Sequence, residues 1–289
     1  MITIKNIQNN ATVTDGTDTI TLGAGDSYTC EPPVINEYME LVIDTTISGG
    51  TASDSFSFAC RGNGVVDWGE GAGDEFFSSV SNNIYSGNTH QYTVAGIYTI
   101  RFKGHFKMEH RSKNNDKFKI IELKNCGSEC YFWEVNNMFG GCANMVITAS
   151  DTLQAVNDNG IQQQMFYNCD SFVTLPKIPT YNTTTMFEFI ASCALFDDDL
   201  GYMDLRLCNN FTNFANGNNN WSTENYGNTL MGWLRWDETT HAPSAGWVLK
   251  SNQNFHGGNS TLVTGSEAAL ARDYLINTLN WTITDGGLI

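Results

Sequence analysis

Three adjacent carboxylates, Asp197, Asp198 and Asp199, are the densest group of metal-binding side chains in the sequence. Carboxylate oxygens are the ligands that calcium prefers, but a calcium loop spaces its acidic residues around a fixed glycine. This run has neither that spacing nor that glycine. We therefore interpret it as a solvated turn between two layers of the fold, with cation binding as the alternative.

Histidine and cysteine form no recognisable catalytic or zinc-binding motif. The histidines are His90, His105, His110, His241 and His256. No two of them lie four residues apart with a glutamate between, as a zinc protease requires. Cys126 and Cys130 form a C-x3-C pair without a second pair to complete a zinc site. No nucleophile elbow or phosphate-binding loop appears, so we expect no metal, no cofactor and no catalytic residue.

Glycoside chemistry receives only weak support from the sequence. The 31 acidic residues could supply a pair of catalytic carboxylates by number alone. Aromatic side chains that could stack on sugars are Trp221, Trp233, Trp236 and Trp247. Tryptophans near the end of a repeat array more often form a capping core, and no segment is left for a separate catalytic domain. We therefore predict a non-enzymatic protein, with a carbohydrate-active enzyme as a remote alternative.

Composition predicts a folded protein that avoids anionic partners. The 289 residues are 41% hydrophobic and only 16% charged, which supplies real cores beneath a surface rich in Asn, Thr, Ser and Gly. The net charge of −16 disfavours general binding to nucleic acid or to membrane surfaces. Two or three modules fit this length.

One short stretch departs from this acidic balance. Eight of the fifteen basic residues lie in it: Arg101, Lys103, Lys107, Arg111, Lys113, Lys117, Lys119 and Lys124. The simpler interpretation is a solvated strand face and loop. The alternative is a docking patch for an acidic partner surface.

Alternating apolar residues predict strands over the first 118 residues. Residues 1–34 contain two strand-like segments around Asp15-Gly16, and Pro32-Pro33 indicates a boundary after them. In residues 35–118 the alternating apolar positions are Leu41, Ile43, Ile47, Phe56, Phe58, Cys60, Tyr98, Ile100 and Phe102. This pattern predicts an antiparallel sheet with one solvated face, folded as a sandwich.

Residues 119–289 contain a repeated unit. Cys142 lies 27 residues before Cys169, which lies 24 residues before Cys193, and a further 24 residues reach Gly217 in a degenerate fourth copy. A period in the twenties is typical of a short leucine-rich-repeat-type solenoid, whose stacked layers align equivalent side chains in ladders.

We predict three buried ladders from this alignment. The first contains Met138, Met165 and Phe189, the second Phe139, Phe166, Ile190 and Phe214, and the third Cys142, Cys169 and Cys193. A buried free cysteine behaves as a small hydrophobic residue. The three cysteines are therefore expected to be packing groups, with disulfides or a metal as the alternative.

A motif within residues 35–118 resembles the PKD-type β-sandwich. It consists of Val66-Asp67-Trp68-Gly69-Glu70-Gly71, then His90-Gln91-Tyr92, then Gly96-Ile97-Tyr98-Thr99-Ile100. Glu70 replaces the second aspartate of that family's turn. The resemblance implies a PKD/Ig-like fold and no particular chemistry. The residues themselves allow Asp67 to cap its own turn.

Residues from about 40 to 287 resemble the BspA-type leucine-rich-repeat proteins. The resemblance rests on Lys119-Ile120-Ile121-Glu122-Leu123, on Met138-Phe139-Gly140-Gly141-Cys142, and on the closing segments Phe255-His256-Gly257-Gly258-Asn259-Ser260 and Trp281-Thr282-Ile283-Thr284-Asp285-Gly286-Gly287. It implies a surface or particle protein implicated in adhesion. The closing segments predict a cap, in which Ser266 begins a helix that covers the last layer and Trp281 and Ile283 form a final strand.

The first residues favour one kind of surface protein. Met1 to Asn6 contain no basic segment followed by an apolar one, and no stretch approaches about 18 apolar residues. We therefore expect neither a secretory signal nor membrane insertion. A bacteriophage protein leaves its cell by lysis and needs neither. We predict a virion-surface protein, as a head decoration, head fibre or tail-associated adhesin, with a bacterial cell-surface adhesin of the BspA type as the alternative.

The expected partners follow from this prediction. Residues 1–34 or the sandwich would contact other virion proteins of the capsid or tail, and the repeats would face outward toward a host-surface glycan or protein. Particle proteins occur in many symmetric copies, so we expect several copies or a homo-oligomer. Nucleic acid is not expected as a partner.

Overall fold

The computed structural model describes residues 2–4, 11–14, 19–22, 28–30, 36–79, 86–111, 116–155 and 160–289. The chain is mainly β, as predicted, and the described residues contain two α-helices. It divides into two compact units, Met1–Ile35 and Asn36–Ile289.

The first unit contains two antiparallel strand pairs. Strand β1 (Ile2–Ile4) pairs with β4 (Tyr28–Cys30), and β2 (Ala11–Thr14) pairs with β3 (Thr19–Leu22). The strands predicted on either side of the hairpin turn are thereby confirmed. The turn residues Asp15-Gly16 and the Pro32-Pro33 boundary lie outside the described residues.

The second unit begins with an antiparallel sheet built around two long strands, β6 (Ser55–Asp67) and β9 (Ile97–Met108). One edge of β6 pairs with β8 (Ser86–Gln91) along its first half and with β7 (Glu75–Ser79) along its second half. Its other edge pairs with β9, which also pairs with β5 (Met39–Asp44).

The same sheet continues past residue 118. After a 3₁₀ turn at Lys117–Lys119, β10 (Ile120–Asn125) pairs antiparallel with β5, and β11 (Cys130–Phe132) pairs parallel with β9. Two short strands, β12 (Val146–Ile147) and β13 (Gln154–Ala155), then add in parallel to β10 and β11. The domain boundary at 118 stays a prediction, and the sheet crosses that position.

The predicted alternation sets the buried face of this sheet. Leu41, Ile43, Phe56, Phe58, Cys60, Ile100 and Phe102 are all fully buried. Phe58 packs edge-on against Phe102, with ring centroids 4.8 Å apart. Tyr98 is partly buried against this cluster, and Ile47 lies beyond the end of β5. One face therefore forms the core, and the intervening side chains line the other face.

The turn after β6 gathers the residues of the Asp-Trp-Gly-Glu-Gly motif. The Gly69 N–H donates to Asp67 Oδ1 at 2.9 Å, so Asp67 caps its own turn as predicted. The Trp68 ring stacks on His90, with centroids 4.8 Å apart, and His90 Nε2 lies 2.8 Å from Glu70 Oε2. Glu70, which stands where the PKD-type motif has its second aspartate, therefore holds His90 against Trp68.

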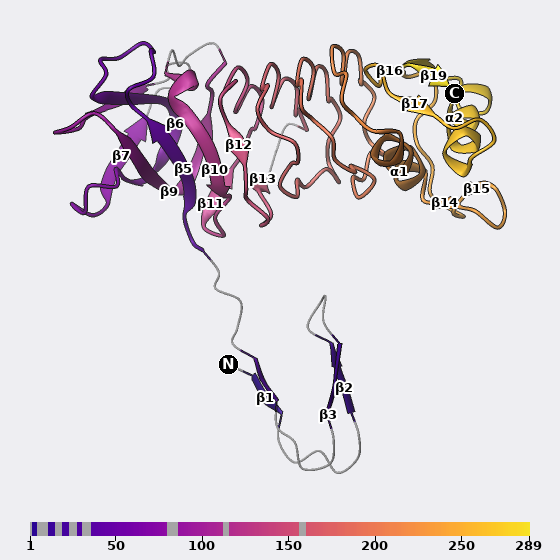
Figure 1. Ribbon diagram of the computed structural model, residues 1–289, viewed down its shortest axis with the longest axis horizontal. Helices are drawn as coiled ribbons and strands as arrows, with labels where there is room; N and C mark the ends of the chain where they lie inside the picture. The colour runs from indigo at the N-terminus through magenta and orange to yellow at the C-terminus, as the bar shows by residue number, and fades with distance from the viewer. Residues whose placement is uncertain are drawn as a thin grey trace. The chain divides into compact units, whose positions relative to one another are not determined.

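From about residue 134 the chain forms successive turns that lie side by side (Figure 1). Backbone hydrogen bonds join each turn to the next. Phe139 N donates to Met165 O at 2.8 Å, Phe166 N to Phe189 O at 3.0 Å, and Ile190 N to Phe214 O at 3.0 Å. Because the donors recur at every second residue, adjacent turns are linked as in a parallel β-ladder.

The interiors of these turns contain the predicted ladder residues. Met138, Phe139, Cys142, Met165, Phe166, Cys169, Phe189, Ile190, Cys193 and Phe214 are all fully buried. The Cys169 thiol donates to Phe139 O at 3.0 Å, and the Cys193 thiol donates to Phe166 O at 3.0 Å. The three ladder cysteines are free thiols, so each one packs in its own turn, and Cys169 and Cys193 also bond to the turn before them.

The fourth turn is displaced by one residue from the predicted alignment. Phe214 stacks on Phe189, with centroids 5.5 Å apart, instead of continuing the ladder of Ile190. The Cys193 N–H donates to Asn218 Oδ1 at 2.7 Å. The fully buried Asn218 therefore occupies the cysteine position, and the predicted assignment of Gly217 to that position was wrong by one residue.

Two positions in every turn have left-handed backbone geometry. The first contains Asn137, Gln164, Glu188 and Asn213, with φ between 51° and 58°, and the second contains Gly141, Asn168, Ser192 and Gly217, with φ between 56° and 85°. This geometry costs about 1 kcal/mol or more for a residue with a side chain. Hydrogen bonds to neighbouring turns hold this backbone geometry in place. The geometry recurs at Asn213 and Gly217, which confirms that the fourth turn is shifted by one residue.

The C-terminal residues close the stack of turns. Helix α1 (Thr223–Leu234) and helix α2 (Glu267–Asn277) pack together, and both begin at a serine cap. Ser266 accepts from Ala269 N at 3.2 Å, which confirms the predicted helix start. The short strands here are β14 (Trp236–Asp237), β15 (Ala242–Pro243), β16 (Asn254–His256), β17 (Thr261–Leu262), β18 (Thr282–Thr284) and β19 (Gly287–Leu288). Within the described residues, no helix is long and apolar enough to cross a membrane.

A buried carboxylate ties this cap together. The Asp285 side chain, which is 1% exposed, accepts hydrogen bonds from Arg272 Nε and Nη2 at 2.8 and 2.9 Å and from the Tyr226 hydroxyl at 2.7 Å. Burial by itself would raise the pKa of Asp285, but these hydrogen bonds outweigh it and the pKa lies below its ordinary value. The charged carboxylate therefore links α1 and α2 to the segment between β18 and β19.

Replacing Asp285 should destabilise the protein in a pH-dependent way. We expect Asp285→Asn to lower the free energy of unfolding by about 3 kcal/mol at neutral pH, since it leaves Arg272 without its charged partner. A lowered native pKa stabilises the fold above the unfolded-state pKa, and that stabilisation is lost as pH falls through the native value. Urea unfolding at several pH values should show the two proteins converging in acid.

The exposed pair Asp204–Arg206 supplies the control for this measurement. Its side chains are 21% and 46% exposed, so Asp204→Asn should cost less than about 1 kcal/mol. Equal losses from the two variants would contradict the role assigned to Asp285.

The ladder cysteines should resist thiol reagents while the protein is folded. Burial raises the pKa of the Cys169 thiol to about 12 and raises those of Cys142 and Cys193 well above their ordinary value. The thiolate is the reactive form. We expect labelling of these three residues, mapped by mass spectrometry, to occur only in denaturant. Rapid labelling of any of them in the native protein would contradict this packing.

Candidate functional site

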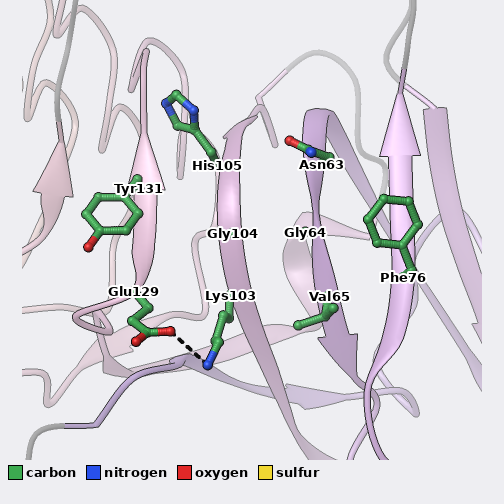
Figure 2. Close-up of a pocket in the computed structure, with 9 residues that line it drawn as sticks. All are labelled: Asn63, Gly64, Val65, Phe76, Lys103, Gly104, His105, Glu129 and Tyr131. Atoms are coloured by element: carbon green, nitrogen blue, oxygen red, sulfur yellow. Dashed lines mark ion pairs between the residues drawn. The ribbon is translucent and has the colours of Figure 1, made fainter.

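A groove of about 470 Å³ lies on the face of the sheet opposite the core, where β7, β6, β9 and β11 run side by side. We call it the sheet groove. It is lined by Asn63, Gly64, Val65, Phe76, Lys103, Gly104, His105, Glu129 and Tyr131 (Figure 2). It is open to solvent along its length.

Strand register brings these residues together from four segments of the chain. In one row across the sheet, Phe76 lies opposite Val65, which lies opposite Lys103. In a second row, Asn63 lies opposite His105, which lies opposite Tyr131. Residues directly opposite each other in a sheet share one face, so both rows line the same groove.

Two paired glycines form the floor of the groove. Gly64 lies opposite Gly104, and a Cβ on Gly104 would lie 2.5 Å from Gly64 Cα. A Cβ on Gly64 would lie 2.4 Å from Lys103 O and 2.9 Å from the ring of the buried Phe77. The two paired strands can therefore approach this closely only without side chains here, which leaves backbone exposed between the two rows.

Aromatic rings stand at the two sides of the groove. Figure 2 shows Phe76 and Tyr131 on opposite sides of the paired glycines. Phe76 is 72% exposed and Tyr131 is 43% exposed. Large exposed rings beside a groove are more typical of a contact surface than of a solvated sheet face.

The lysine of the groove pairs with two carboxylates. Lys103 Nζ lies 2.8 Å from Glu129 Oε2 and 2.9 Å from Glu37 Oε2, and also lies 5.2 Å from the centre of the Tyr38 ring. The hydrogen bonds to Glu129 and Glu37 raise the pKa of Lys103 above its ordinary value. The ammonium group is therefore held charged and positioned, which suits binding better than proton transfer.

A second hollow extends the sheet groove toward the stacked turns. It has a volume of about 260 Å³ and is lined by Tyr131, Gln154, Ala155, Pro179 and Tyr181. Tyr131 belongs to both hollows and lies opposite Gln154 in the β11–β13 pair. Tyr181 is 61% exposed, so a third exposed ring lies beyond Tyr131.

The eight residues of the predicted docking patch do not form one exposed surface. Lys107 and Lys119 are buried. Lys119 Nζ donates to Ser55 O at 2.7 Å and to Ala52 O at 2.8 Å, while Lys107 pairs with Glu134. Their ammonium groups are inside the protein, so the docking prediction fails for these two residues.

Apart from Lys103, the other described basic residues of this stretch lie in two pairs. Arg101 pairs with Glu40 at 2.9 Å, and Lys124 lies 4.0 Å from the same glutamate. The Arg111 guanidinium lies 4.3 Å from the centre of the Tyr167 ring, and Lys117 Nζ donates to Arg111 O at 2.9 Å. Lys113 lies outside the described residues. Among the described residues of the predicted patch, only Lys103 lines the sheet groove.

The three adjacent aspartates accept hydrogen bonds from backbone N–H groups, and only those to Asp197 and Asp198 come from distant segments. Asp197 Oδ1 accepts from Ser222 N at 2.8 Å, Asp198 Oδ2 from Leu175 N at 2.9 Å, and Asp199 Oδ1 from Gly201 N at 2.7 Å. Burial raises the pKa of Asp198. The prediction of a solvated turn is wrong for the first two carboxylates, which are partly buried, while Asp199 is exposed. The described residues contain no group of three or more His, Cys, Asp or Glu side chains placed to hold a metal.

The tryptophans considered for sugar stacking lie in the cap. Trp221 and Trp233 are buried, and Trp236 packs partly buried against the same core, as predicted for a capping core. Two guanidinium groups lie over the Trp247 ring, with Arg206 at 4.1 Å and Arg235 at 4.8 Å from its centre. The exposed rings beside the sheet groove come from other residues.

Sequence reasoning missed the sheet groove, although part of its signal was present. Val65 and His105 occupy the positions that alternate with buried residues of β6 and β9, so their outward orientation could have been inferred. The positions of Phe76 and Tyr131 beside them depend on the pairing of β7 with β6 and of β11 with β9. No local pattern specifies either pairing.

Comparison with known proteins adds nothing to this geometry. No protein-family description, no curated protein and no solved structure matches the chain. The description of the candidate site therefore depends on its own residues.

Substitution of Gly104 should test whether the close approach of β6 and β9 at the groove floor requires a glycine. Gly104 has φ +135° and no room for a Cβ, whereas Gly71 has φ +79° and no atom within 4 Å of its added Cβ. We expect Gly104→Ala to cost about 3 kcal/mol of stability and Gly71→Ala about 1 kcal/mol. Urea unfolding measures both losses of stability, and losses of equal size would show that the two strands leave room for a side chain at Gly104.

Proposed function

We propose that this chain is a non-enzymatic binding protein displayed on a surface, and that the sheet groove is part of its contact face. The observation that carries the proposal is the pairing of exposed rings, Phe76 and Tyr131, around a backbone floor and a neutralised lysine. Such a groove offers contact area and fixed hydrogen-bonding groups. Its one lysine is held by two carboxylates and is unsuited to acid–base chemistry.

We further propose finer descriptions for the two parts of residues 36–289. The stacking of Trp68, His90 and Glu70 in the turn after β6 supports a PKD/Ig-like sandwich. The hydrogen-bonded turns, with their buried thiol ladder, support a solenoid of the leucine-rich-repeat type. Both assignments agree with the BspA-like pattern of the sequence.

A bacteriophage particle is the surface that we propose. The separate compact unit Met1–Ile35 suits an attachment module, and low charge density with a net charge of −16 suits a displayed protein. Its partners would be other virion proteins, and the particle would hold several copies. A bacterial cell-surface adhesin is the second candidate, favoured by the BspA-like repeats.

Localisation tests this proposal. Particles purified from the source sample should contain the chain by mass spectrometry, and antibodies raised against residues 36–289 should label the particle surface in immunogold electron microscopy. Recovery from bacterial envelopes with absence from particles would replace the virion proposal with the adhesin. Recovery only as a free protein would overturn both.

A further inference from the structure

We infer that the sheet groove, extended by the hollow between Tyr131 and Tyr181, binds a neutral oligosaccharide. This inference rests on the proposed function and makes it more specific, because it names the class of ligand that the surface would contact. The extended groove is lined by exposed aromatic rings, side-chain amides and backbone, with one charge cluster in which a single lysine faces two carboxylates.

The rings supply the apolar half of sugar recognition. A pyranose ring has faces of C–H groups, which pack on aromatic rings, and a rim of hydroxyl groups. Phe76, Tyr131 and Tyr181 are 72%, 43% and 61% exposed. Three rings exposed along one surface therefore offer successive stacking positions.

The polar side chains between the rings match the hydroxyl rim. Asn63 and His105 form one row with Tyr131, and Gln154 lies opposite Tyr131 on the other side. An amide both donates and accepts hydrogen bonds, as a hydroxyl group does. The groove can therefore direct hydroxyl groups on both sides of the Tyr131 ring.

The charges favour a neutral ligand over an acidic one. Lys103 is the lysine of the groove, and its ammonium group lies within 2.9 Å of two carboxylates, on Glu37 and Glu129. An acidic sugar or a phosphate would have to compete with them. The net charge of −16 would repel such a ligand further.

The length of the surface indicates several sugar units. Phe76 on β7 and Tyr131 on β11 are separated by three inter-strand steps, through β6 and β9. At about 4.8 Å for each step this distance is roughly 14 Å, and Tyr181 lies farther along. A single monosaccharide would reach only one of the rings.

An extended peptide fits this surface less well. Peptides commonly bind a sheet by adding a strand at its edge, where backbone groups are free. The groove crosses β6 and β9 in the interior of the sheet, and their backbone groups are already paired with each other. A peptide would therefore gain few main-chain hydrogen bonds here.

A glycan array followed by calorimetric titration of the best ligand tests the inference on the full chain. The array should contain neutral and acidic oligosaccharides of several lengths. We expect binding to neutral oligosaccharides, with affinity rising beyond the disaccharide. Tyr131→Ala and Phe76→Ala should each weaken binding by about ten-fold, as expected for the loss of one stacked ring.

The exposed Phe118 supplies a matched control, because it is 40% exposed and does not line the groove. Phe118→Ala should bind within about two-fold of wild type. Thermal unfolding of every variant, compared with wild type, distinguishes loss of a ring from loss of the fold. Tyr131→Phe keeps the ring and should retain most of the affinity.

Several outcomes would overturn the inference. These are absence of any glycan binding, preference for acidic glycans, and equal loss in the Phe118 control. These results would not affect the localisation experiment. The proposal of a displayed protein would stand, and its ligand would be of another class. Absence from every particle and envelope, with the glycan binding intact, would instead remove the proposed display and keep the binding site.

Discussion

Every turn of the stacked region depends on its neighbours for its backbone hydrogen bonds. Phe139 N, Phe166 N and Ile190 N all bond to carbonyls of the following turn, because a single turn has no partner for these groups within itself. An unpaired buried backbone group costs free energy comparable to a lost hydrogen bond. The array must therefore start from a paired edge and finish on a cap.

The two ends of the array meet this requirement differently. At its start, β11 and β13 extend the edge of the sheet, so the first turns add to strands that already exist. At its end, Ala215 N bonds to His256 O, and the helices that follow are tied down by Asp285. The same continuity places Tyr131 beside His105, so the groove forms where the sheet changes from antiparallel to parallel pairing.

Features encoded by local periodicity could be predicted from the sequence, and features set by distant contacts could not. Alternation identified the buried positions of β5, β6 and β9, and the repeat identified the cysteine ladder. The fourth turn was misaligned by one residue because Asn218 replaces the thiol with an amide that bonds to Cys193 N. The basic stretch looked like a patch because some of its carboxylate partners, such as Glu40 and Glu37, lie far away in the sequence.

Because the turns stack in parallel, the length of this unit and the residues of its binding groove depend on different parts of the chain. Each complete turn adds one inter-strand rise, about 4.8 Å, between the sheet and the C-terminal cap. The residues of the sheet groove lie on strands before the stack, apart from the final hollow at Pro179 and Tyr181. Related chains could therefore gain or lose whole turns and change the span of this unit in regular steps, while the rings at Phe76 and Tyr131 keep their geometry.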